Sequence, residues 1–225
     1  MSNFSNITKW LKSDTSHIDV IITHVALLGG VLYFFFTITS ALVHPGGIAY
    51  FGTFMSELGS WKPNGYDNVF GYSLFLMSAV TDVVLTSPFW FVTVRRYFNR
   101  DRVEHLIAWV GAITGPLSAI SFLISVLYPI DIQYKVHIFI ASGFSVFSVV
   151  AAISYTLLTL KRSDYPHSRI LAVICVIYFV GTMFYMFPIV DGAQKLVQKT
   201  TIYLFVVWSM MHALIVRKKI ITKLT

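Results

Sequence analysis

The chain has 225 residues, of which 56% are hydrophobic and only 12% are charged, and its formal net charge is +7. A soluble domain carries about 25% charged residues, and a globule of this size could not bury so much apolar surface. The composition therefore excludes a soluble protein and indicates an integral membrane protein. The basic residues flank the apolar stretches, so we expect them to contact anionic membrane lipids and not nucleic acid.

Six apolar stretches are each long enough to cross a bilayer as a helix, which takes about 20 residues. We predict spans over residues 19–43, 69–94, 103–128, 134–160, 167–190 and 199–216. The stretches lack the alternation of barrel strands, so helices are the structure that satisfies their backbone in hydrocarbon. We therefore expect an all-α fold, a six-helix transmembrane bundle over residues 19–216. A tail of residues 1–18 precedes it and a basic tail of residues 217–225 follows it.

Positive charges are distributed unevenly between the two sides of these spans. On the side of the termini, the tails and the second and fourth connections hold 13 Lys and Arg residues; the other side holds 4, which are Lys62, Lys135, Lys195 and Lys199. Cytoplasmic segments carry such an excess. We therefore predict a multi-pass protein of the cell membrane with both termini in the cytoplasm and a long first outer loop over residues 44–68.

Asp82 lies near the middle of the second predicted span. On insertion scales, a carboxylate at the centre of a membrane helix costs about 2.5–3.5 kcal/mol. Ser78 and Thr86 lie four residues to either side, on the same helical face. The three residues predict an intramembrane polar site, either for a proton or cation or for hydrogen bonds to a neighbouring helix.

Histidines and carboxylates are concentrated at the predicted outer ends of the spans: His44, Glu57, Asp67, Asp131, His137 and Asp191. Among them, Glu57, Asp131 and His137 could form a catalytic group in which a carboxylate orients the imidazole as a general base. The same residue types can bind zinc, but their spacing matches no known metal motif. We therefore predict no cofactor and keep a metal at this cluster as an alternative.

Three further patterns concern helix packing and the ends of the spans. Gly111 and Gly115 form a small-xxx-small pattern, which predicts a helix-packing seam and a place for lipid or a partner subunit. His24 and His212 lie at similar depth, so they could meet at a haem or metal, or could each bond locally. Four tryptophans near the ends of the spans are expected to be interface anchors: Trp61, Trp90, Trp109 and Trp208.

Short motifs at the outer ends resemble a known family. They are Ser56-Glu57-Leu58-Gly59, Asn68-Val69-Phe70, Tyr128-Pro129-Ile130-Asp131 with His137, and Gly192-Ala193-Gln194-Lys195-Leu196. The chain resembles the prokaryotic six-helix membrane family catalogued as domain of unknown function 998 and, more remotely, the Frag/DRAM-type membrane proteins. Tyr128 and Ile130 depart from the Phe and Thr of the family pattern. The resemblance implies six helices with the motif residues at the outer face, and it transfers no activity.

Three functions stay open at this point. The first is a lipid-interacting protein or an accessory subunit of a membrane complex without its own catalysis, which the short loops and few intramembrane charges favour. The second is an outer-face enzyme that acts on lipid headgroups with Glu57, Asp131 and His137. The third is a proton- or cation-coupled transporter that uses Asp82.

Overall fold

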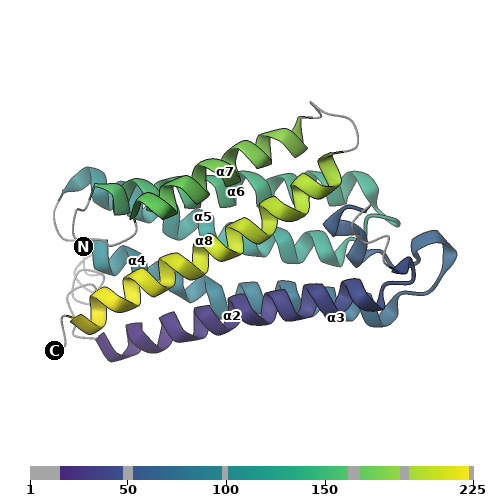
Figure 1. The fold of residues 1–225 in the computed structure, drawn as a ribbon, viewed down its shortest axis with the longest axis horizontal. Helices are drawn as coiled ribbons and strands as arrows, with labels where there is room; N and C mark the ends of the chain where they lie inside the picture. The colour runs from purple at the N-terminus through teal and green to yellow at the C-terminus, as the bar shows by residue number, and fades with distance from the viewer. Residues whose placement is uncertain (1–15, 48–52, 98–100, 162–167, 188–192, 223–225) are drawn as a thin grey trace, which may run out of the picture.

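The structure is a computed structural model that describes residues 16–47, 53–97, 101–161, 168–187 and 193–222. Within these ranges it is helical and contains no strand. Six helices are long and apolar enough to cross a membrane (Figure 1). They are α2 (Ser16–Val43), the continuous run of α3 (Val69–Thr81), η4 (Asp82–Thr86) and α4 (Ser87–Tyr97), then α5 (Arg102–Leu127), α6 (Tyr134–Leu160), α7 (Ser168–Met186) and α8 (Gln194–Thr222). The prediction of an all-α chain with six apolar helices is confirmed.

The helix bounds agree with the predicted spans except in the last two helices. α7 ends at Met186, before the predicted end at residue 190, and residues 188–190 lie outside the described ranges. α8 extends beyond both predicted ends and includes part of the basic C-terminal tail. The prediction marked where the apolar run ends, whereas Lys, Arg and Gln are good helix formers, so the helix continues through them.

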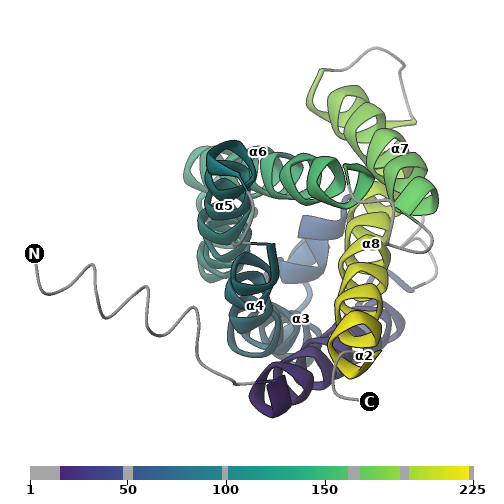
Figure 2. The ribbon, with the colours of Figure 1, turned by 90° about the vertical axis from the view of Figure 1, so that its left-hand side faces the viewer.

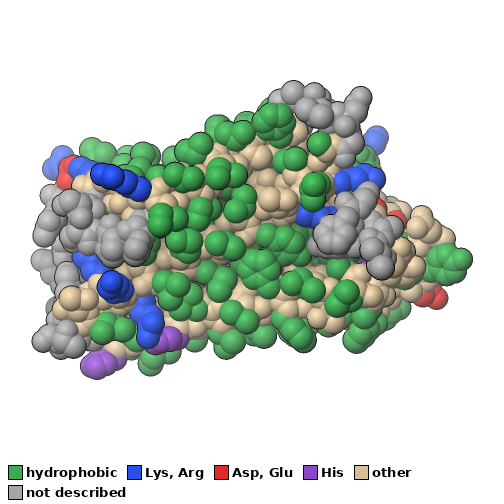
Figure 3. All heavy atoms as spheres, viewed as in Figure 1, with side chains coloured by type: hydrophobic (Ala, Val, Ile, Leu, Met, Phe, Trp, Pro, Cys, Tyr) green, Lys and Arg blue, Asp and Glu red, His purple; other side chains and the backbone are tan. Residues whose placement is uncertain are grey.

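The six spans form a ring in chain order. Each packs against the next, and α8 closes the ring by packing against α2 (Figure 2). On the face shown in Figure 3, Lys and Arg side chains lie towards the two ends of the bundle, and many hydrophobic side chains lie between them. A lateral surface of this kind suits a lipid environment.

Aromatic side chains fill the centre of the ring. Trp208 of α8 is stacked on Phe205 and on His212, with ring centroids 6.1 and 5.4 Å apart. Trp90 lies beside Trp208, and its backbone carbonyl accepts a 2.6 Å hydrogen bond from the Tyr155 hydroxyl. Trp90 and Trp208 are therefore buried core residues and not the interface anchors that their sequence positions suggested.

Gly111 and Gly115 of α5 lie directly against two of these aromatic rings. A Cβ atom at Gly111 would overlap the ring of Tyr155, and one at Gly115 would overlap the ring of Trp90. The two glycines thus let α5 approach its neighbours α6 and α4. The seam is covered within the chain, so it does not offer the surface where a lipid or partner subunit was expected.

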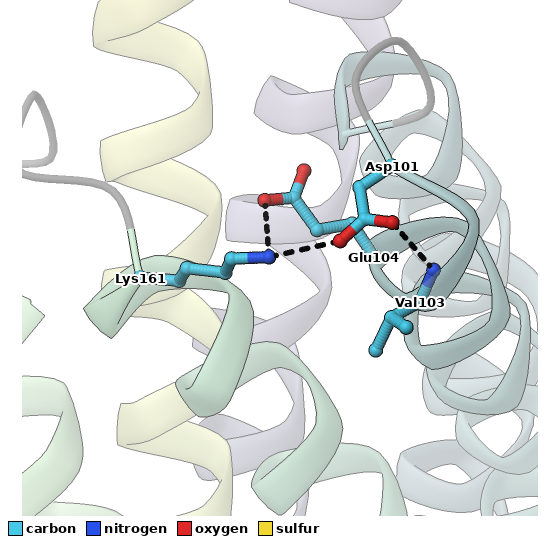
Figure 4. A network of polar contacts seen from close by, with 4 residues as sticks. All are labelled: Asp101, Val103, Glu104 and Lys161. Atoms are coloured by element: carbon cyan, nitrogen blue, oxygen red, sulfur yellow. Dashed lines mark hydrogen bonds and ion pairs between the residues drawn. The ribbon is translucent and has the colours of Figure 1, made fainter.

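Ion pairs connect the helices at one end of the bundle, which we call the basic end. The Lys161 ammonium lies 3.2 Å from a carboxylate oxygen of Asp101 and 3.2 Å from one of Glu104 (Figure 4). A hydrogen bond from the Val103 amide is the main stabilisation of the ionised Asp101 carboxylate, and a hydrogen bond from Lys161 is the second. Both lower the pKa of Asp101. The hydrogen bond from Lys161 to Asp101 and, second in size, the one to Glu104 raise the pKa of Lys161. These contacts join the start of α5 to the end of α6.

We predict that Gly115→Ala lowers the free energy of unfolding by about 1–3 kcal/mol, because the added methyl group overpacks the contact with Trp90. Gly143→Ala is the matched control, because the nearest atom to its new Cβ is 3.4 Å away, an ordinary contact. Unfolding in mixed detergent micelles measures both. Equal stability of the two variants would contradict the packing described here.

We also predict a pH-dependent effect of Asp101→Asn. Because folding lowers the pKa of Asp101, its contribution to stability is complete above the ordinary carboxyl pKa of about 3.9 and is lost as the pH falls through the lower folded value. The wild type should melt at a slightly higher temperature than the variant at about pH 6, and this gap should close towards about pH 2.5. A gap that stays constant over this range would contradict the assignment.

Candidate functional site

A segment without a long helix covers the end of the bundle opposite the basic end. We call residues 54–68 the plug segment and this end the plug end. The segment contains the short 3-10 turns η2 (Met55–Gly59) and η3 (Pro63–Gly65). Seen along the bundle, η2 lies across the middle of the ring of helices (Figure 2). Met55 and Leu58 are each only 1% exposed, so the plug segment is part of the core.

Side chains of the surrounding helices and of the segment itself bond to its backbone. The Met55 amide donates to Oε1 of Gln198 on α8 at 2.9 Å. The Asn68 side-chain amide donates to the carbonyls of Leu58 at 3.1 Å and Ser60 at 2.9 Å. Asn68 thereby fixes the end of the plug segment at the start of α3.

Two further residues of the predicted outer cluster also bond to this backbone. His44 Nδ1 accepts from the Gly46 amide at 3.1 Å, so Nε2 carries the proton and donates to the Glu57 carbonyl at 3.3 Å. The Asp131 carboxylate accepts from the amides of Trp61 at 3.1 Å and Lys62 at 2.7 Å. Asp131 therefore positions the plug segment, and no described hydrogen bond joins its carboxylate to His137.

A cavity of about 400 Å³ lies beneath the plug segment, between α6, α7 and α8. Its walls are mainly apolar, with Phe75, Phe122 and Phe144 on the side of the core. Polar groups in the lining come from the plug segment, from α5 and α6, and from the ends of α7 and α8: Ser56, Glu57, Ser125, Tyr134, His137, Ser142, Ser145, Tyr185 and Gln198. An apolar pocket of this size with a few polar groups is the usual form of a ligand site.

His137 forms part of this lining and is only 2% exposed. Its Nδ1 lies 2.8 Å from the carbonyl oxygen of Ser125 and 2.9 Å from that of Tyr128. Both carbonyls only accept, so Nδ1 carries a proton and donates to them. The imidazole thus closes the connection between α5 and α6, and carbonyl groups, not a carboxylate, set its orientation.

Glu57 lines the same cavity, so the structure brings two of the three predicted catalytic residues to one site. Its Oε1 accepts from the Phe54 amide at 3.2 Å, within the plug segment. Its charge also attracts Lys199, a buried residue of α8. The described interactions of the Glu57 carboxylate are therefore with the plug segment and α8.

The intramembrane site around Asp82 is smaller and largely self-contained. Asp82–Thr86 form one π-helical turn, η4, which is an unusual element that often marks functional sites. The Thr86 hydroxyl lies 2.5 Å from both the carbonyl oxygen and Oδ1 of Asp82. Ser78 instead donates to the Phe75 carbonyl at 2.6 Å. The structure thus joins Asp82 to Thr86 and leaves Ser78 out of the pair.

The remaining candidate ligands are separated. His24 is exposed on α2, with Nδ1 2.9 Å from the Val20 carbonyl, whereas His212 is buried among the core aromatics. Asp191 lies outside the described residues. Among the residues that the structure does describe, no group of three His, Cys, Asp or Glu side chains could hold a metal ion.

Sequence reasoning missed most polar members of the cavity, among them Ser145, Tyr185 and Gln198. Tyr185 and Ser145 are hydrogen-bonded to each other across α7 and α6. Both lie in apolar runs, where a lone hydroxyl is no more than a weak signal. Gln198 lies beside a predicted span end, and only the fold shows that it meets the plug segment.

Comparison with known proteins adds no relative. No family model, curated protein or solved structure matches the chain. The resemblance to the six-helix family therefore stays a prediction. Four residues of its motifs, Glu57, Asn68, Asp131 and His137, make hydrogen bonds at the plug end.

We predict that Asp131→Ala loosens the plug segment, because the amides of Trp61 and Lys62 lose their acceptor. Stability should fall by about 1–2 kcal/mol, and hydrogen exchange should accelerate at these two amides. Asp67→Ala is the control, because its ion pair with Lys62 is exposed and is worth about 0–1 kcal/mol. Exchange that is unchanged in Asp131→Ala would contradict the positioning role.

Proposed function

We propose that this chain is a multi-pass protein of the cell membrane that binds a lipid at the plug end and has no catalytic step of its own. The observation that carries the proposal is the cavity of about 400 Å³, with its apolar walls and its few polar groups. Ligand sites fall in the range of about 300–1,000 Å³. With the six helices across a bilayer, the cavity would lie near one end of the spans, where lipid headgroups meet hydrocarbon.

In the proposed orientation, the basic end and both termini face the cytoplasm and the plug end faces outward. The support is the distribution of Lys and Arg, with 13 on the side of the termini and 4 on the other. Positive charge on short connecting segments is retained on the cytoplasmic side. The cavity would then take its ligand from the outer leaflet.

Lipid binding has more support than the accessory-subunit form of the hypothesis. The small-residue seam at Gly111 and Gly115 was the surface expected to receive a partner, and rings of the same chain cover it. The cavity, by contrast, is a space within the bundle that the chain leaves open. A lipid is the abundant amphiphile next to such a space.

The headgroup-enzyme alternative keeps one supporting observation, which is that Glu57 and His137 line the same cavity. Against it, carbonyl groups hold Nδ1 of His137 and the Asp131 carboxylate bonds to the plug segment. The transporter alternative relies on Asp82, which lines a cavity of about 10 Å³. That volume holds roughly one water molecule. Neither arrangement offers the machinery that its function needs.

Native mass spectrometry of the protein purified in mild detergent tests lipid binding. We expect a lipid-sized adduct on the wild type that survives mild delipidation. Ala141→Trp should reduce its occupancy on the order of tenfold or more, because the indole occupies the cavity that Ala141 lines. Phe139→Trp is the matched control on α6, because Phe139 is 81% exposed and lies outside the cavity lining. A wild type without an adduct, or equal occupancy in both variants, would contradict the proposal.

A further inference from the structure

One residue of the cavity lining, His137, holds a polar atom that the fold itself leaves unsatisfied. Nε2 of His137 is buried and has no hydrogen-bond partner among the residues that the structure describes. The other ring nitrogen, Nδ1, is protonated and committed to the carbonyls of Ser125 and Tyr128. In the neutral imidazole Nε2 is therefore an acceptor. A buried acceptor without a donor costs free energy, so a ligand that supplies a donor is favoured.

Five other polar residues of the lining already make hydrogen bonds within the protein. The Tyr185 and Ser145 hydroxyls bond to each other. The Ser142 hydroxyl donates to the Ile138 carbonyl at 2.8 Å, and the Ser125 hydroxyl donates to the Phe122 carbonyl at 2.7 Å. Oε1 of Gln198 accepts from the Met55 amide. Nε2 of His137 differs from these groups because it is buried and has no partner among the described residues, so its requirement for a donor favours a ligand that carries one.

The charges of the lining disfavour an anionic headgroup. Glu57 contributes a carboxylate, and the described lining contains no Lys or Arg. Lys199, which is attracted by Glu57, lies outside the lining. A phosphate next to Glu57 would experience like-charge repulsion at short range in a medium of low dielectric constant. An uncharged donor such as a hydroxyl group avoids this repulsion.

We propose that the cavity binds an uncharged amphiphile with a free hydroxyl group, which donates a hydrogen bond to Nε2 of His137. The apolar body of the ligand lies against Phe75, Phe122 and Phe144. The ligand class is that of membrane-derived long-chain alcohols and hydroxyl-bearing neutral lipids. This inference rests on the proposed function and adds the chemistry that the site selects.

Three probes of equal chain length separate the contribution of the hydroxyl donor from the effect of a charged headgroup. They are oleyl alcohol, its methyl ether and oleyl phosphate. The purified full chain is titrated with each in a detergent that has no hydroxyl group, and binding is followed by native mass spectrometry. We expect the alcohol to bind about tenfold more tightly than the ether, the gain from one buried hydrogen bond to an otherwise unsatisfied acceptor. The phosphate should bind more weakly than the alcohol.

His137→Asn isolates the role of Nε2. The asparagine NH2 group can still donate to the carbonyls of Ser125 and Tyr128, while the acceptor at the Nε2 position is removed. The variant should bind the alcohol and the ether with similar affinity. A melting curve reports whether it is folded; if it is not, the wild-type comparison of alcohol with ether decides alone.

The outcomes separate the two proposals. If the wild type binds alcohol and ether equally, or binds the phosphate most tightly, the hydroxyl-selective site is wrong while lipid binding stands. A folded His137→Asn that still prefers the alcohol also overturns it. If no probe binds and the purified protein carries no lipid adduct, the proposed function fails as well.

Discussion

The structure depends on how the backbone of the plug segment is satisfied at the end of an apolar bundle. Residues 54–68 are not in a long helix, so their amides and carbonyls lack the internal partners that a helix supplies. At the edge of hydrocarbon such groups must find partners within the protein. Gln198, Asn68, His44 and Asp131 provide them, each by a bond from a side chain to the plug backbone. Met55 and Leu58 add apolar burial, and together these contacts fix the segment across the ring.

The fixed plug segment explains why a cavity remains beneath it. Its backbone is held at several points, so it cannot sink further between α6, α7 and α8 to fill the space. The core on the other side is equally fixed, because stacked rings from α4, α6 and α8 occupy the centre. Interiors of this density deform little. The open volume is thus a consequence of two rigid layers, and His137 lies at its wall with one nitrogen committed to the protein.

The sequence predicts the spans well and the site only in part, for physical reasons. Helix number follows from the length of apolar runs, which hydrocarbon thickness requires. Trp90 and Trp208 were wrongly predicted to be interface anchors, because the position of a residue along a span does not determine whether its side of the helix faces the core. The π-helical turn at Asp82 could not be predicted, because it changes which backbone groups are hydrogen-bonded to each other and leaves the hydropathy pattern unchanged. His137 and Glu57 were recognised from their residue types, but whether His137 meets a carboxylate or a carbonyl depends on the fold of the connection at Tyr128.

The most direct test of a lipid site beneath the plug segment is photocrosslinking in intact cells, with a diazirine amino acid placed at Ser142 in the cavity lining. The same group at Phe139, which is exposed on α6, samples the surrounding bilayer. The account predicts that Ser142 yields predominantly one lipid class by mass spectrometry, whereas Phe139 yields the mixed lipids of the membrane. The same mixture at both positions, or only water adducts at Ser142, would contradict it.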